Sequence, residues 1–302
     1  MSDSPTSHII QSLVSNLVIA VSKGVAAVLS GSGAMLAETL HSFADCGNQL
    51  LLLLGVRQAR RPPDAKHPQG YGRALYFWSF MVALLLFSGG GVFSIYEGLH
   101  KLEHPEPVSD ITVGAIVLGI SLLVEGWSTW ANIKELNARG GDTGFFRYLS
   151  ASKDSDLIVI FGENSAAVAG LVFALGAIVM ARHTGDGRWD AVGSLLVGVV
   201  LVGVAVFLAT EVKSLLVGES ADPSVEVAVR QVAADDPNIV EVLRVLTIQQ
   251  GPGEVVVAAK IRMRDGLMTA DEVCRAINAF EVKVEAAAPD VRWLYIEPDI
   301  ED

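Results

Sequence analysis

The chain has 302 residues, of which 51% are apolar, a formal net charge of −12 and a mean hydropathy of +0.44. This acidic balance argues against a nucleic-acid-binding protein, because phosphate binding needs clustered Lys and Arg side chains. The only two cysteines, Cys46 and Cys274, provide neither a disulfide framework nor a Cys-x-x-Cys metal motif.

Apolar residues are concentrated in six stretches, each long enough to cross a bilayer, which takes about 20 residues. These stretches are residues 9–30, 33–56, 76–99, 111–133, 156–181 and 189–210. Beyond them the chain is charged, with 18 acidic and 9 basic residues between 210 and 302. The sequence therefore predicts an α-helical membrane domain with six transmembrane helices over 1–210 and a small soluble domain over 211–302.

The basic residues predict the orientation of these helices. Lys and Arg cluster at 57–73 and again at 134–153, and such clusters face the cytoplasm. Six crossings then place both termini and the soluble domain in the cytoplasm. Residues 1–10 contain no Lys or Arg, so a cleavable signal peptide is not expected. The lack of a targeting segment favours a bacterial inner membrane over an organelle membrane.

Residues 211–302 alternate between helical and strand patterns. Asp222-Pro223 is a typical helix start, Gln250 to Gly253 is a typical hairpin turn, and Thr269 with Glu272 forms a capping-box pattern. The predicted order is αββαβ, an α+β domain with helices on one face of a small sheet, similar to a truncated ferredoxin-like fold. The elements are helix 224–233, strands 239–249 and 254–263, helix 270–287 and strand 291–296.

The second span contains a histidine and a carboxylate, His41 and Asp45. A charged side chain at membrane depth costs roughly 2.5 kcal/mol or more, so it needs a reason. Residues four apart lie on one face of a helix, where the imidazole and carboxylate could bind a divalent ion such as zinc or, as a competitor, manganese. The alternative is that both side chains only hydrogen-bond neighbouring helices together.

Other polar residues in the spans accompany this pair. Glu38 lies on nearly the same stripe of the second span, and Glu163 in the fifth span is at a depth suited to meeting it. We therefore predict that Glu163 meets the acidic stripe of the second span. Lys23 in the first span is expected to face the bundle interior, or else to extend toward an interface.

Two further segments leave alternatives open. The turn-rich stretch from Asp64 through His67 to Gly72 could hold a second, weaker ion, or it could be an ordered loop. Gly89–Gly91 in the third span either allows close helix contact or introduces a bend.

Taken together, these residues resemble the cation diffusion facilitator family, most closely the branch containing the mitochondrial-type zinc transporter and its bacterial relatives. The resemblance extends through nearly the whole chain. It rests on Glu38 to Asp45 with Asn48-Gln49, His67 to Arg73, Glu125-Gly126, Ser152 to Asp154, Glu163 to Ala167 and Leu216 to Ser220.

The resemblance implies a dimeric six-helix exporter that moves a divalent ion out of the cytoplasm in exchange for protons. Its transport site would be formed by His41 and Asp45 with Glu163. One departure is in the fifth span, where Ala167 stands at a position that is a further ligand in many members, and Asn164 at one that is commonly Asp in the closest branch. Asn164 or water would then be the fourth ligand, with Glu38 as an accessory one. Residues 210–302 contain no His, so we expect this domain to dimerise without a zinc cluster.

The resemblance thus implies a divalent metal exporter, specifically a Zn²⁺/H⁺ antiporter. The alternatives are a transporter of Mn²⁺, Co²⁺, Fe²⁺ or Cd²⁺, and a non-transporting dimeric scaffold with a degenerate metal site. An enzyme is not expected, because the soluble domain has no Gly-rich phosphate loop or nucleophile-base pair. The expected partners are the metal ion and protons as substrates, the lipid bilayer and a second copy of the chain, with no cofactor and no nucleic acid.

Overall fold

The computed structural model describes residues 5–105, 111–140, 155–266 and 269–301. Most of the predicted basic loop 134–153 and the Ser152 to Asp154 motif lie outside these residues. The chain divides into two units, which are described separately. The first comprises Met1–Val56, Phe77–Ser150 and Ser155–Val212, and the second Arg57–Tyr76, Ala151–Asp154 and Lys213–Asp302.

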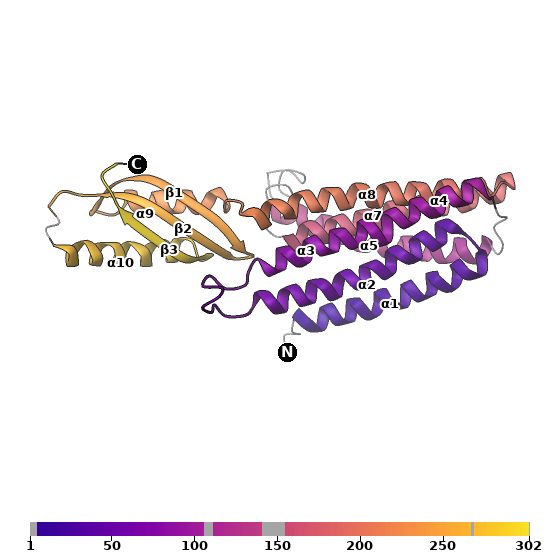
Figure 1. Ribbon diagram of the computed structural model, residues 1–302, viewed down its shortest axis with the longest axis horizontal. Coiled ribbons are helices and arrows are strands. Elements are labelled where there is room, and N and C mark those ends of the chain that lie inside the picture. Colours follow the sequence, from indigo (N-terminus) through magenta and orange to yellow (C-terminus); the bar gives the residue numbers. More distant parts are fainter. Residues whose placement is uncertain (1–4, 106–110, 141–154, 267–268, 302) are drawn as a thin grey trace. The chain divides into compact units, whose positions relative to one another are not determined.

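The first unit is a bundle of long helices that lie side by side (Figure 1). A seven-residue π-helical segment, Leu86–Val92, joins α3 to α4, so that these form one continuous helical path. The helices are α1 (Pro5–Ser30), α2 (Gly33–Ala59), α3 (Ala74–Leu85), α4 (Phe93–Glu103), α5 (Ile111–Gly140), α7 (Ser155–Thr184) and α8 (Arg188–Val217).

Four helical segments within the described residues are long and apolar enough to cross a membrane: Ala74–Glu103, Thr112–Lys134, Ile158–Thr184 and Arg188–Val217. They confirm the third to sixth predicted spans. Among the described residues of α1, the apolar part Asn16–Ser30 is shorter. The helix α2 is continuous, but the polar stripe that begins at Glu38 interrupts its apolar sequence. The crossings by α1 and α2 therefore stay a prediction.

Glycines let α8 approach the α3–α4 path closely. A Cβ atom on Gly91 would lie 2.7 Å from Val202 Cγ2, and one on Gly98 would lie 2.7 Å from Leu195 Cγ. Larger residues would push the helices apart, as expected for small-residue packing of transmembrane helices. The close-contact alternative for Gly89–Gly91 is thus confirmed, and the π-helical segment lies at the same place.

The start of α2 is held by Asp190, the third residue of α8, which is 1% exposed. Its carboxylate accepts hydrogen bonds from the backbone N–H of Gly33 at 2.6 Å and of Ala34 at 3.3 Å, and from the Ser32 hydroxyl. Lys101 Nζ, near the end of α4, lies 3.5 Å from the same carboxylate. A helix N-terminus presents unpaired N–H groups and favours a negative charge. Asp190 therefore ties α2 to α8 and α4.

The second unit has the predicted order αββαβ. Strand β2 lies in the middle of the sheet, antiparallel to β1 and parallel to β3, with α10 as the crossover between β2 and β3. The elements are α9 (Pro223–Ala234), β1 (Ile239–Gly251), β2 (Glu254–Met263), α10 (Ala270–Ala287) and β3 (Val291–Pro298). The three-stranded domain is confirmed, while the similarity to a ferredoxin-like fold stays a prediction.

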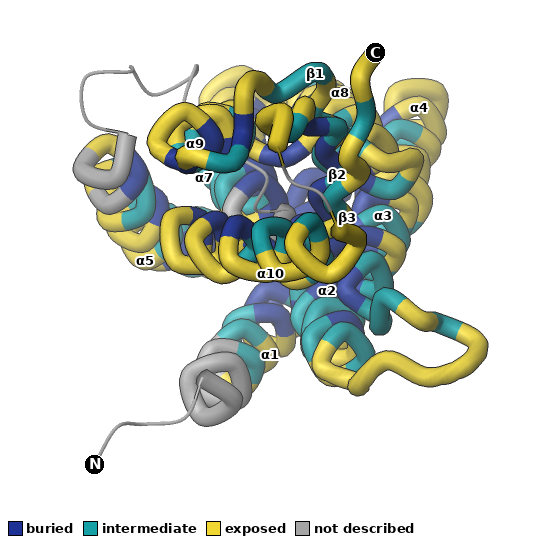
Figure 2. Tube along the Cα trace, turned by 90° about the vertical axis from the view of Figure 1, so that its left-hand side faces the viewer, coloured by how far each residue is buried: buried dark blue, intermediate teal, exposed yellow. Residues whose placement is uncertain are grey.

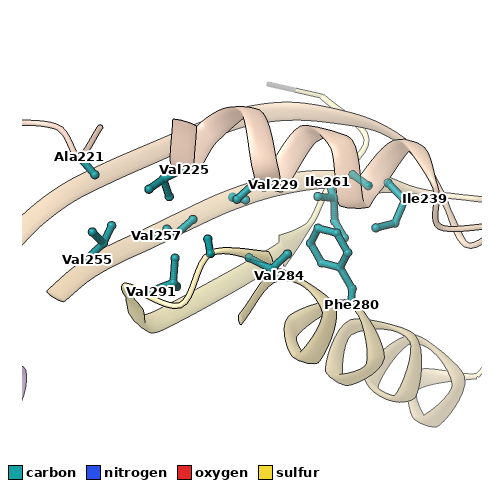
Figure 3. Packing of buried hydrophobic residues seen from close by; sticks show 13 residues of the cluster. Ala221, Val225, Val229, Ile239, Val255, Val257, Ile261, Phe280, Val284 and Val291 are labelled. Atoms are coloured by element: carbon teal, nitrogen blue, oxygen red, sulfur yellow. The ribbon is translucent and has the colours of Figure 1, made fainter. Parts of the chain in front are cut away.

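Both helices of this unit cover the same face of the sheet. Val229 of α9 packs with Phe280 and Val284 of α10 over Val257 and Ile261 of β2 (Figure 3). Alternate residues of a strand point to one face, which explains why residues 257 and 261 of β2 enter this core. The outer side of α10 is exposed (Figure 2). The predicted capping box is confirmed, since Thr269 and Glu272 bond to each other's backbone N–H.

The segment Arg57–Tyr76 belongs to the second unit, which the sequence did not predict. A Cβ atom on Gly72 would lie 2.7 Å from the Gln250 carbonyl oxygen, so the segment packs against the β1–β2 hairpin. Asp64 accepts hydrogen bonds from the backbone N–H of His67 at 2.7 Å and from the Tyr71 hydroxyl at 2.7 Å. The Tyr71 bond is the main cause that lowers the pKa of Asp64. These bonds support the ordered-loop alternative.

Replacing Asp190 by Ala should destabilise the bundle by about 3 kcal/mol or more, because Lys101 loses its buried partner and the start of α2 loses its cap. Thermal unfolding of the purified protein in detergent measures this. Asp190→Asn keeps one acceptor oxygen and should lose less. An unchanged melting temperature in Asp190→Ala would show that the contact does not hold α2.

The second unit should lose stability on acidification through Asp236. Burial raises the pKa of Asp236, but the hydrogen bond from Lys283 at 2.7 Å and that from the Asn238 backbone outweigh it, so the pKa is lowered. The ion pair of Asp236 with Lys283 contributes about 1 kcal/mol to the free energy of unfolding, because Lys283 is half exposed. This contribution is complete above the unfolded pKa of Asp, about 3.9. It is lost as the pH falls through the folded value. Unfolding curves of wild type and Asp236→Asn should converge at acid pH; a constant difference would contradict this.

Candidate functional site

A polar stripe follows one face of α2. Its members, Glu38, His41, Asp45 and Asn48, are spaced three or four residues apart, which places them one above another on a helix. At about 1.5 Å per residue the stripe extends roughly 15 Å along the helix axis. Glu38, His41 and Asn48 have no exposed surface. The structure therefore turns the costly polar residues of α2 toward the interior of the bundle.

Lys23 of α1 pairs with the Glu38 end of this stripe. Its Nζ lies 3.0 Å from Glu125 Oε1 of α5 and 3.3 Å from Glu38 Oε2, and it donates a hydrogen bond to the Ser42 hydroxyl at 2.9 Å. We call Lys23, Glu38, Ser42 and Glu125 the Lys23 cluster. Lys23 is 0% exposed, so its predicted interior orientation is confirmed and the interfacial alternative is wrong.

His41 and Asp45 lie next to each other with unused bonding capacity. His41 Nδ1 is 3.6 Å from Asp45 Oδ1, which is too far for a hydrogen bond. Neither ring nitrogen of His41 nor Asp45 Oδ1 has a hydrogen-bond partner, and all three atoms are buried. Buried polar atoms are nearly always paired, so unpaired ones need an explanation such as a functional role. An imidazole nitrogen and a carboxylate oxygen at this separation can bind a metal ion.

Glu163 of α7 reaches the other end of the stripe through Asn48, whose side-chain amide donates a hydrogen bond to Glu163 Oε1. Asn48 was part of the family resemblance but was not predicted to have a role. Its position three residues after Asp45 on the same helix face was the available signal.

Asn164, the predicted fourth ligand, is the next residue along α7 and so points about 100° away from Glu163. Its backbone carbonyl accepts a hydrogen bond from Thr129 of α5 at 3.5 Å. The backbone of α7 at Asn164 thus contacts α5. The role of the Asn164 side chain as a ligand stays a prediction.

The predicted set thus divides along the stripe. His41 and Asp45 meet directly, Glu163 joins them through Asn48, and Glu38 is held by Lys23. Beside Glu38, α7 presents Gly170, where any Cβ would overlap Glu38 Oε1. Gly170 is seven residues from Glu163, or about 10 Å along the helix. Among the residues with described positions, no three His, Cys, Asp or Glu side chains form a group that could hold a metal ion. The ligand set stays a prediction that requires Glu163 to move.

Comparison with known proteins identifies a family. The model of the cation efflux transmembrane domain matches residues 9–217, a range that includes α2 and α7 with their polar side chains. The mitochondrial proton-coupled zinc antiporter SLC30A9 of Xenopus laevis is 33% identical over 241 residues, which is 79% of this chain and 43% of that protein. The human protein of that name is 32% identical over the same length, 79% of this chain and 42% of its own.

Metal tolerance protein C4 of Arabidopsis thaliana is 35% identical over 195 residues, 64% of this chain and 43% of that protein. The chain thus spans less than half the length of these curated relatives. The family model nevertheless covers more than half of this chain, and it covers α2, which carries the buried polar stripe. This protein belongs to the cation efflux family, the cation diffusion facilitators, whose members are membrane transporters and not enzymes.

Proposed function

We propose that the protein transports a divalent metal cation, specifically as a Zn²⁺/H⁺ antiporter that moves the ion out of the cytoplasm by alternating access. His41 and Asp45 of α2 and Glu163 of α7 would be the ligands, with Asn164 or water as the fourth. The observation that carries the proposal is that His41 is fully buried next to Asp45 and that neither of its ring nitrogens has a hydrogen-bond partner.

The same ligands can couple metal to protons. Zinc requires a neutral imidazole and ionised carboxylates, so binding displaces any protons that these groups carry. To complete the site, Glu163 would have to turn its other carboxylate oxygen toward Asp45 while Asn48 keeps its hydrogen bond to Oε1. Proton uptake by the carboxylates on the other side of the membrane would then release the ion. A rearrangement between α2 and α7 therefore changes both the access to the site and its affinity.

The surroundings of the site belong to the same proposal. We propose that α1 and α2 cross the membrane with the other four helices, that both termini and the second unit are cytoplasmic, and that the protein forms a homodimer. A bacterial inner membrane was predicted from the sequence, whereas the antiporters of Xenopus laevis and Homo sapiens are named as mitochondrial.

A second candidate is a dimeric membrane scaffold with a degenerate site. It is favoured by the same geometry that leaves Glu163 bonded to Asn48, and by Ala167 at a position where the family often has a ligand. Calorimetry with zinc on the purified protein separates the two, since a scaffold gives no binding heat that depends on His41.

Asp45→Ala should lower zinc uptake into inverted vesicles by about tenfold or more, because a ligand is lost at a buried site. Uptake is measured with an imposed pH gradient, and an ionophore that collapses the gradient should abolish it. Asp186→Ala, which removes an exposed aspartate from the α7–α8 turn, is the matched control. Transport by Asp45→Ala at the wild-type rate would refute the proposed ligand set, and uptake that survives the ionophore would refute proton coupling.

Asn48→Ala should weaken zinc binding by about 10- to 100-fold without abolishing it, since residues that orient a ligand typically contribute this much. Asn48 would position Glu163 rather than bind the ion. Calorimetric titration of the purified variant measures the dissociation constant. Gln49→Ala removes the neighbouring amide, which points about 100° away, and serves as the control. Equal zinc affinities in wild type and Asn48→Ala would remove Asn48 from the site.

A further inference from the structure

We infer that Lys23 is a specificity-determining residue. It holds Glu38 and Glu125 and so limits the number of carboxylates that the transported ion meets near His41. This inference rests on the proposed function, because it concerns which ion that site prefers. Its basis is the Lys23 cluster, in which helices α1, α2 and α5 each contribute one charged side chain.

The ammonium group lies where a cation would lie. Lys23 Nζ is within 3.3 Å of one oxygen from each of two carboxylates and 2.9 Å from a hydroxyl, and it has no exposed surface. These are oxygen donors of the kind that hard divalent cations take from proteins. The ammonium group of Lys23 thus fills an oxygen-rich position beside the candidate site, where a metal cation could otherwise lie.

Both carboxylates keep an unused oxygen. Glu38 Oε1 and Glu125 Oε2 are buried and have no hydrogen-bond partner, so the contacts to Lys23 use only half of each group's bonding capacity. Gly170 on α7 leaves the space into which Glu38 Oε1 extends. Each carboxylate of the cluster therefore has one oxygen that could bind a metal ion, while its other oxygen is held by Lys23.

These carboxylates are close enough to matter for an ion at His41. Glu38 is three residues before His41, about 4.5 Å along the axis and on the same face of α2. Glu125 shares the ammonium group of Lys23 with Glu38. Without the ammonium group, either carboxylate could turn its free oxygen toward an ion bound to the imidazole.

The chemistry of the ions gives the direction of the effect. Zinc is satisfied by about four ligands and accepts imidazole readily, whereas carboxylate, carbonyl and water suit manganese, typically in an octahedral set of six oxygens. With Lys23 in place, the ion meets one imidazole and the carboxylates of Asp45 and Glu163. With Lys23 removed, two more carboxylates become available. Lys23 therefore favours zinc over manganese.

Lys23→Met tests this with Zn²⁺ and Mn²⁺ titrated separately into the purified full-length chain in detergent micelles. The ratio of the Zn²⁺ to the Mn²⁺ dissociation constant should change by about tenfold or more in favour of manganese, which corresponds to about 1.4 kcal/mol. In Lys23→Met/Glu38→Gln/Glu125→Gln no carboxylate is gained, so the ratio should return toward the wild-type value. Size-exclusion chromatography checks that each variant is folded.

Lys23→Gln/Glu125→Gln is the second variant for the case that Lys23→Met does not fold. It keeps the net charge of the cluster at −1 and releases Glu38 alone, so the ratio should change in the same direction but less. A wild-type ratio in either folded variant overturns the inference, as does a shift that persists in the triple variant. If wild type itself shows no zinc binding that depends on His41, the proposed function fails instead, and the two failures are thereby distinguished.

Discussion

The structure depends on the compensation of charge inside the helical bundle. An isolated charge away from water is costly, and the described part of the bundle meets this cost with partners from other helices. Lys23 joins Glu38 to Glu125, and Asp190 is matched by Lys101 and by the N–H groups at the start of α2. Both arrangements involve α2, so these charged contacts constrain its position and rotation.

Compensation is uneven along α2, and this unevenness marks the candidate site. One oxygen of Glu38 is paired with a cation, whereas neither nitrogen of His41 has a hydrogen-bond partner and Asp45 Oδ1 has none either. Proteins tolerate such departures from complete pairing mainly at functional positions. One face of a single helix thus combines a part that holds the bundle together with a part that remains available to an ion.

Local patterns predicted the second unit well and the membrane helices in part. Strand alternation and the Thr269 capping box depend on neighbouring residues, so the αββαβ order could be recognised from the sequence. Four of the six spans meet the length and hydropathy of a membrane helix. In α2 the polar residues of the candidate site lower the hydropathy, and in α1 the described apolar part is shorter. The packing of Arg57–Tyr76 with the second unit was missed, since it joins segments far apart in the chain.

By itself the sequence determined the helical and strand elements, the stripe on α2 and the closeness of His41 to Asp45, because each follows from the geometry of a single element. The tertiary structure alone decided that Lys23 meets Glu125, 102 residues away, and that Asn48 meets Glu163, 115 residues away. It also separated Glu38 from Glu163. The physical reason is that contacts between helices depend on the rotation and axial register of each helix, which arise only when the whole bundle packs.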